Sequence, residues 1–258
     1  MSFTKPQTKP MNPPPIPNPL PQRPAIAGRF AFEPMPAGKS PILMIEALLK
    51  YPGRIIHELQ HNWRVELSSW LLVLALLGMA LYGVVVGSFS GGPQMWIAPA
   101  KLALGTLLSV LICLPSLYIF ACLGGIDARL RTVSGVLFAA VGLGALLLIG
   151  FAPVAWIFSQ STDSVAFMGA LHLLLWAIGI GFGLRLIEAM GRLLTGSARS
   201  HLKLWGLIFV VVCLQMTTTL RPIIASSKTF FPTEKKFFLA NWFDSLSGPA
   251  AEKKKTDD

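Results

Sequence analysis

Five long apolar runs dominate the pattern of hydrophobic and polar positions, and short polar or glycine-containing breaks separate them. A transmembrane helix needs about 20 apolar residues to cross a hydrocarbon layer of about 30 Å. In lipid only helices and closed barrels satisfy their backbone groups, and the alternating segments of a barrel do not occur here. The pattern predicts an all-α, polytopic membrane protein with a transmembrane domain over residues 66–225. The five predicted spans cover about residues 68–89, 96–123, 134–158, 165–187 and 204–225.

The segments that flank the apolar runs have other patterns. Residues 1–41 hold 12 of the 20 prolines, which predicts a disordered, extended arm without a secretory signal peptide. Residues 42–65 carry two amphipathic patterns that are broken at Tyr51, and these predict flanking interfacial helices. Residues 226–258 predict a tail that contains an aromatic amphipathic helix.

Composition and charge exclude several classes of protein. The chain is 53% hydrophobic and 13% charged, whereas soluble domains carry about 25% charged residues. An ordinary soluble enzyme is therefore excluded, and no nucleic-acid partner is expected. The net charge of +10 comes from basic residues outside the apolar runs, where they meet lipid headgroups. The lipid bilayer is the expected partner.

Basic residues in the breaks predict the orientation. Arg129 and Arg131 follow the second run, Arg192, Arg199 and Lys203 follow the fourth, and eight more precede the first. By the positive-inside rule these segments are cytoplasmic, which places the N-terminus in the cytoplasm and the C-terminus outside a bacterial inner membrane. Lysines in the C-terminal tail conflict with this arrangement and leave open a re-entrant fifth run.

Cysteines and histidines give little support for metal or disulfide chemistry. Cys113, Cys122 and Cys213 lie inside apolar runs without CxxC spacing, and we interpret them as buried small hydrophobes. His57 and His61 have a possible metal spacing but no third ligand nearby, so we interpret them as part of a solvated helix face. We expect no catalytic residue, no metal and no cofactor.

Polar residues inside the predicted spans form the candidate site, because such residues are costly in lipid. His172, Gln215, Thr218, Thr219 and Arg221 fall at or beyond mid-depth of the fourth and fifth runs. One interpretation is a polar lining or a lipid-headgroup site in the outer half of the bundle. The other is hydrogen bonding between helices together with an arginine at the interface.

Charged residues near the ends of the runs predict local interactions. Glu188 is three residues from Arg185 and four from Arg192, which predicts ion pairs with both arginines at the membrane interface. A gate is the alternative interpretation. Lys101 lies near the outer end of the second run, and we expect it to reach the headgroups as an anchor.

Prolines and glycines predict how the helices bend and pack. Pro115 and Pro153 lie inside the second and third runs and predict bends. Glycines four residues apart predict faces where two helices approach closely. These glycine faces are Gly83 with Gly87 and Gly179 with Gly183.

Three segments resemble parts of a known group of proteins. The sequence ICLPSLYIF at Ile112–Phe120 and QMTTTLRPI at Gln215–Ile223 resemble stretches of uncharacterised bacterial five-span inner-membrane proteins, as does the tail around Asn241 and Trp242. The arm followed by five spans also resembles the topology of the Yip family. The resemblance covers roughly residues 66–245. It implies a five-helix membrane fold and no catalytic residues.

The sequence leaves three functions open. The lack of a reactive constellation, the glycine faces and the proline-rich arm predict a non-enzymatic scaffold or accessory subunit of a larger membrane assembly, with membrane-protein partners. A small-solute or ion transporter or channel that uses the polar cluster is the first alternative. A lipid-modifying membrane enzyme is the second alternative, for which the sequence offers no obvious nucleophile or carboxylate pair.

Overall fold

The computed structural model describes residues 31–35, 40–62, 65–162, 164–195 and 200–219, and it contains seven helices over these residues. No described residue lies in a strand, so the all-α prediction is confirmed for this part of the chain. The helices are α1 (Pro41–Lys50), α2 (Pro52–His61), α3 (Val65–Ser90), α4 (Gln94–Leu123), α5 (Leu130–Ser161), α6 (Val165–Thr195) and α7 (Ser200–Thr219).

Four helices, α3 to α6, are long and apolar enough to cross a membrane. Their length and apolar composition confirm the prediction of a multi-pass membrane protein. The helices extend past the predicted spans, because α5 begins at Leu130 and α6 continues to Thr195. No proline interrupts the backbone in these extensions, so the helical hydrogen bonds continue past the apolar runs. Residues 1–30, 220–225 and 226–258 lie outside the described part, with the predictions made for them.

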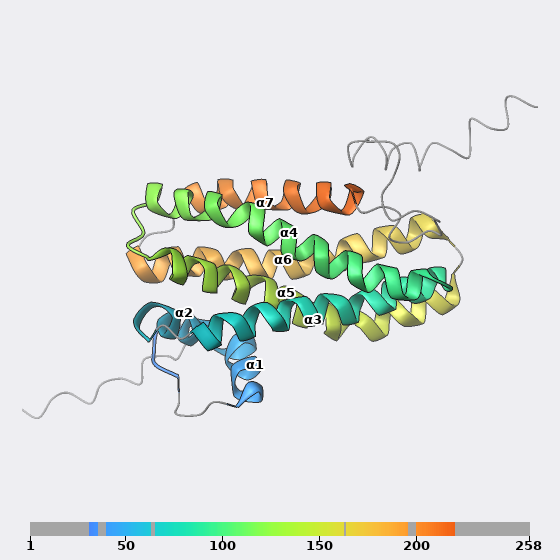
Figure 1. Cartoon of the computed structure of the whole chain (residues 1–258), viewed down its shortest axis with the longest axis horizontal. Helices are drawn as coiled ribbons and strands as arrows, with labels where there is room; N and C mark the ends of the chain where they lie inside the picture. Colours follow the sequence, from blue (N-terminus) through green and yellow to red (C-terminus); the bar gives the residue numbers. More distant parts are fainter. Residues whose placement is uncertain (1–30, 36–39, 63–64, 163, 196–199, 220–258) are drawn as a thin grey trace, which may run out of the picture.

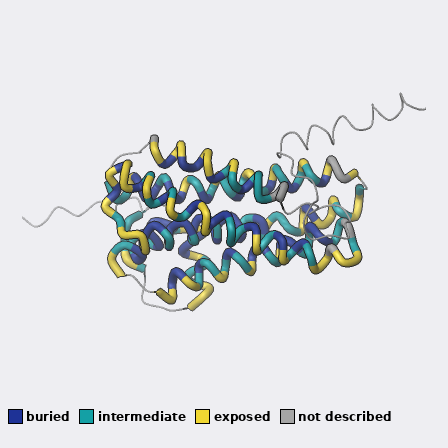
Figure 2. Tube along the Cα trace, turned by 45° about the horizontal axis from the view of Figure 1, so that its top comes forward, coloured by how far each residue is buried: buried dark blue, intermediate teal, exposed yellow. Residues whose placement is uncertain are grey.

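The long helices lie side by side along one axis (Figure 1). α3 packs most extensively against α5 and α4, α6 packs against α5, and α7 packs mainly against α4 and less against α6. Buried positions run through the middle of this bundle and exposed ones face outward (Figure 2). In a bilayer the exposed apolar side chains meet lipid, because the hydrocarbon layer surrounds the spanning helices.

A tight turn reverses the chain between α3 and α4. Gly91 and Gly92 have φ of +64° and +56°, values that other residues adopt only at a steric cost. Away from the turn, a Cβ on Gly83 of α3 would lie 2.5 Å from Pro99 Cα of α4. The bare glycine therefore lets α3 approach the backbone of α4 closely.

The predicted break at Tyr51 is present, since this residue separates α1 from α2. α1 runs across the direction of the long helices near one end of the bundle (Figure 1). The apolar side chains of Ile55, Ile56 and Leu59 on α2 are fully buried, and α2 packs against α5 and α6. Protein therefore covers much of the apolar face of α2. We call this end of the bundle the α2 end.

Candidate functional site

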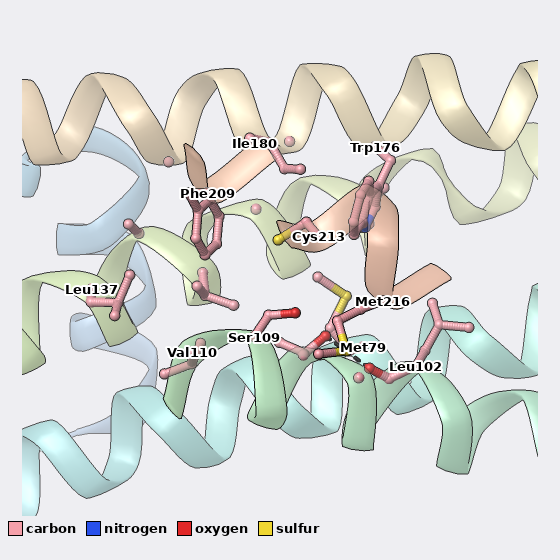
Figure 3. A pocket seen from close by; sticks show the side chains of 18 of the residues that line it. Met79, Leu102, Ser109, Val110, Leu137, Trp176, Ile180, Phe209, Cys213 and Met216 are labelled. Atoms are coloured by element: carbon pink, nitrogen blue, oxygen red, sulfur yellow. Dashed lines mark hydrogen bonds between the residues drawn. The ribbon is translucent and has the colours of Figure 1, made fainter. Parts of the chain in front are cut away.

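A cavity lies inside the bundle and is lined from α3, α4, α5, α6 and α7. It offers about 70 Å³ to water-sized molecules and is partly open to the outside of the bundle. Side chains from these helices converge on it in Figure 3, where Met79, Ser109, Leu137, Ile180 and Cys213 are labelled. Cavities between the helices of a bundle are frequent ligand sites.

The cavity wall is mainly apolar, with a few polar groups on α4 and α7. Thr106 donates its hydroxyl to the Leu102 carbonyl at 2.8 Å, so this hydrogen bond stays within α4. Ser109 on α4 and Cys213 on α7 also line the cavity. Figure 3 shows both of these side chains at the cavity. Such a wall suits an apolar solute with a small polar part.

Lys101 is the charged residue of the described cavity wall. Its exposed fraction is 0%, so it is enclosed by the bundle. We expected Lys101 to reach the headgroups as an anchor, and this interpretation is wrong because the side chain is buried in the bundle. Lys101 lies seven residues after the start of α4, about 10 Å along the axis at 1.5 Å per residue. A lysine at this depth inside a bundle is typical of functional sites in membrane proteins.

The face of α4 that carries Lys101 also carries small residues at intervals of three or four. Ala98, Gly105, Ser109 and Cys113 are all buried. Small residues at this spacing let other helices approach closely. This spacing is the signal in the sequence that could have identified the inward face of α4.

His172 is buried but is not among the residues of the cavity wall, and its partner Tyr82 belongs to a second buried cluster built from α3, α5 and α6. The hydroxyl of Tyr82 lies 2.7 Å from His172 Nδ1, and the two rings meet edge to face at 5.6 Å. His172 Nε2 has no hydrogen-bond partner among the described residues. The geometry favours the interhelical hydrogen bond over the polar lining for His172.

Of the predicted polar cluster, the structure describes the side chains of His172 on α6 and Gln215 on α7. Gln215 is half-buried on α7 and is absent from the described cavity wall, although its neighbour Met216 belongs to it. The side chains of Thr218 and Thr219, and the whole of Arg221, lie outside the described residues. For these three the prediction stays a prediction.

The predicted ion-pair ladder on α6 forms at one of its two steps. Arg192 Nη1 lies 3.7 Å from Glu188 Oε2, with both side chains partly exposed. The guanidinium of Arg185 instead lies over the ring of Phe182, 5.5 Å from its centroid. Partly exposed pairs contribute little stability. These residues are therefore best described as local interactions at the α2 end.

Pro115 and Pro153 lie inside the continuous helices α4 and α5. Next to Pro115, Ser116 donates its hydroxyl to the Cys113 carbonyl at 2.8 Å. The same oxygen accepts a 3.0 Å hydrogen bond from the Trp205 indole of α7. Ser116 thus links α4 to α7, which the sequence alone did not indicate.

Glycines on α5 and α6 form one wall of the cavity. A Cβ on Gly179 would lie 3.2 Å from the Gly144 carbonyl oxygen, and one on Gly183 would lie 2.7 Å from that of Ala140. The predicted glycine face at these two positions therefore serves contacts within the chain. No other helix fits there without separating α5 from α6.

A separate cluster of side chains lies at the α2 end. The ring of Phe32 packs edge to face on His57 at 4.8 Å and on His61 at 5.6 Å. The Met35 amide donates to Glu58 Oε1 at 3.2 Å, which fixes residues 31–35 on α2. Burial and the neighbouring His61 lower the pKa of His57, and Glu58 opposes them. No group of three possible metal ligands exists among the described residues.

Comparisons with known proteins found no relative of this chain. No protein-family model, no curated protein and no solved structure matches it. The geometry of the cavity is therefore the main guide to function.

Proposed function

We propose that this chain is a five-span integral membrane protein that holds a small solute inside its helix bundle without transforming it, as a transporter or binding protein. The observation that carries this proposal is the cavity lined from five helices, with Lys101 enclosed in its otherwise largely apolar wall. One interpretation of the sequence drew a polar lining from His172, Gln215, Thr218 and Thr219, whereas the cavity supports a lining built from α4 and α7. This is why a solute-binding role now precedes the scaffold role.

The length of α7 supports a fifth span. Its 20 residues correspond to about 30 Å at 1.5 Å per residue, which matches the thickness of the hydrocarbon layer. α7 also lies along α4 and contributes Phe209, Cys213 and Met216 to the cavity wall. A re-entrant segment would leave the cavity without these residues at their present depth.

The distribution of basic residues supports the proposed orientation. Arg129, Arg131, Arg192 and Lys203 all belong to helix ends or a connection at the α2 end. By the positive-inside rule that end is cytoplasmic. A bacterial inner membrane and membership of a group of five-span proteins with Yip-like topology are part of the same proposal.

Two cysteines offer a direct test, because Cys213 lines the cavity and Cys113 is buried outside its wall. In lipid nanodiscs we expect a small neutral maleimide to label Cys213 faster than Cys113. The variant Cys113→Ala/Cys122→Ala leaves Cys213 as its cysteine, and Cys122→Ala/Cys213→Ala leaves Cys113. Mass spectrometry measures the rate at which each variant is labelled. Equal rates would contradict a cavity that solutes enter.

An accessory-subunit role is the second candidate, and the docking of residues 31–35 on α2 favours it. Arg54 Nη2 lies 3.4 Å from Glu33 Oε2, and this contact adds to those of Phe32 and Met35. The proline-rich sequence therefore joins the bundle at a folded platform, where a partner can meet both. Purification of the full chain in mild detergent tests this role. The role requires that a partner copurifies in a fixed ratio, and that this partner is lost when Pro13–Pro15 are replaced by alanine.

A further inference from the structure

We infer that α1 lies in the plane of the membrane, inside the leaflet at the α2 end, with its exposed apolar side in contact with lipid acyl chains. The partner of this surface is the hydrocarbon of one leaflet. The surface lies outside the bundle, so its partner does not depend on the solute cavity. Three features of α1 support this: the depth at which it packs, the division of its exposed surface and the balance of its charges.

α1 meets the bundle at the depth of the hydrocarbon layer. A Cβ on Gly142 of α5 would lie 3.8 Å from Leu48 Cδ2, so α1 packs on α5 at this residue. Gly142 is twelve residues from Leu130, the first residue of α5, which corresponds to about 18 Å along the axis. The 32 residues of α5 extend over about 48 Å, which exceeds a hydrocarbon layer of about 30 Å by about 18 Å. Any such layer that lies within the length of α5 begins at most about 18 Å from Leu130, so Gly142 lies at or inside its boundary.

The direction of α1 keeps it near this depth. It runs across the long helices (Figure 1), so its ten residues do not extend far along the bundle axis. Its side chains that point away from the bundle therefore meet lipid and not open water.

The exposed surface of α1 has an apolar side and a polar side. Ile42, Ile45 and Leu49 are three and four residues apart, which places them on one side of the helix. Ile42 is 76% exposed. Glu46 and Lys50 lie on the neighbouring side, where a 2.9 Å salt bridge joins them and both are exposed. A surface divided in this way fits the boundary between acyl chains and headgroups.

α2 has a different partner, although the sequence predicted an interfacial helix for both segments. Its apolar residues Ile55, Ile56 and Leu59 are fully buried by protein. Of the two amphipathic patterns, the one in α1 therefore keeps an apolar side that lipid can cover.

The charges of α1 balance. Glu46 and Lys50 are its charged residues, and they pair with each other. A helix with a basic polar side gains attraction to anionic headgroups, but α1 has no net charge that would supply it. Its apolar side therefore determines insertion, and we expect no requirement for anionic lipid.

The accessibility of spin labels on the full-length chain in phosphatidylcholine nanodiscs tests this inference. Ile42→Cys and Lys50→Cys are labelled one at a time in a variant that lacks the native cysteines. We expect the ratio of oxygen accessibility to that of a neutral nickel chelate to be at least about fivefold higher at Ile42, because oxygen concentrates in hydrocarbon and the chelate stays in water.

Val73→Cys on α3 is the matched control for contact with lipid. Val73 is 51% exposed and lies two residues from Leu71, whose carbonyl oxygen would be 3.4 Å from a Cβ on Gly142. The label at Ile42 should therefore give a ratio like that at Val73. A ratio typical of water would overturn the inference. Low accessibility to both reagents would also overturn it, because protein would then cover α1, and dipolar broadening between labels would identify that protein as a second copy.

Two further measurements complete the test. On the unsubstituted chain, a phosphatidylcholine with a diazirine in its acyl chain should label residues 41–50, and labelling of α3 and α5 without α1 would overturn the inference even if Ile42→Cys does not fold. Addition of phosphatidylglycerol should change the ratio at Ile42 by less than about twofold. Insertion that requires this lipid would overturn the assignment to the apolar side. The labelling of Cys213 and Cys113 tests the cavity separately from all of these results.

Discussion

Tyr82 and His172 form the shortest described contact between polar side chains of different helices, at 2.7 Å between α3 and α6. The exposed fraction of each residue is below one tenth, at 2% and 7%. Neither side chain can exchange this partner for water without opening the bundle. In membrane proteins such hydrogen bonds contribute about 0.6 kcal/mol on average, so this bond between α3 and α6 contributes modestly to the stability of the bundle.

We predict that Tyr82→Phe lowers the free energy of unfolding by about 1 kcal/mol, because it keeps the ring and leaves His172 Nδ1 without its partner. Unfolding in mixed micelles by denaturing detergent measures this change. A double-mutant cycle with His172→Leu isolates the pairwise contribution. Additive effects of the two substitutions would show that the hydrogen bond contributes nothing.

At the residue scale the sequence predicted the membrane class but misplaced Lys101, which was expected at the headgroups. For His172 it left two interpretations open, and the hydrogen bond with Tyr82 fits the interhelical one. Helices α3 and α4 are apolar on every side, so the difference between the lipid face and the protein face is small. Hydropathy alone therefore gives the depth of a residue in the membrane but not the direction in which its side chain points. Direction depends on packing with helices distant in sequence.

At the scale of helices, the contact of α5 with α6 depends on glycine. A Cβ on Gly183 would lie 2.7 Å from the carbonyl oxygen of Ala140, which is too close for an ordinary contact. Both sides of this contact are backbone, so neither can rotate away. The same helix carries Gly181, where an added Cβ has nothing within 4 Å.

We predict that Gly183→Ala lowers the free energy of unfolding by about 1–3 kcal/mol, the usual cost of overpacking. Gly181→Ala is the matched control and should change stability by less than about 1 kcal/mol, in the stabilising direction, since alanine favours helix. Thermal unfolding of both variants in nanodiscs measures the difference. Equal stability of the two variants would show that α5 and α6 separate at no cost.

Burial, followed by the neighbouring His61, lowers the pKa of His57 from 6.5, while Glu58 opposes the shift. The folded state therefore disfavours the protonated histidine relative to the unfolded state. Below pH 6.5 the unfolded or undocked segment binds the proton first, so stability falls as the pH falls. The stabilisation is fully present above this pH. The affected contact is the packing of Phe32 on both histidines.

We predict that residues 31–35 exchange their amide hydrogens faster as the pH falls from about 7 to below 6.5, after correction for intrinsic exchange rates. His61→Asn removes one cause of the lowered pKa and should weaken this pH dependence. His201→Asn is the control, because this histidine lies on α7 outside the cluster. A pH dependence that His57→Asn leaves unchanged would contradict the assignment.

Much of the helix order could be predicted from sequence because the breaks are chemically explicit. The Gly91–Gly92 turn, the interruption at Tyr51 and the polar connection before α5 all occur where expected. The cavity could not be predicted, because it depends on which faces of five separate helices meet. The spacing of small residues on α4 marks the inward face of that helix but does not tell which helices meet it.

At the scale of the whole molecule the two ends of the bundle differ in charge. Arg129, Arg131, Arg192 and Lys203 lie at the α2 end. Lys101 lies nearer the opposite end and inside the bundle. An even number of spans would place the segments before α3 and after α7 on the same side, and an odd number would place them on opposite sides.

We predict that the two chain ends lie on opposite sides of the membrane in a bacterial host, as follows from the proposal that α7 crosses as a fifth span. Green fluorescent protein should fluoresce when fused before residue 1, and alkaline phosphatase should be active when fused after residue 258. A phosphatase inserted between α6 and α7 should be inactive, since four crossings return the chain to the cytoplasm. An inactive C-terminal phosphatase with the other two results unchanged would make α7 re-entrant. It would also leave open the depth in the membrane at which Phe209, Cys213 and Met216 line the cavity.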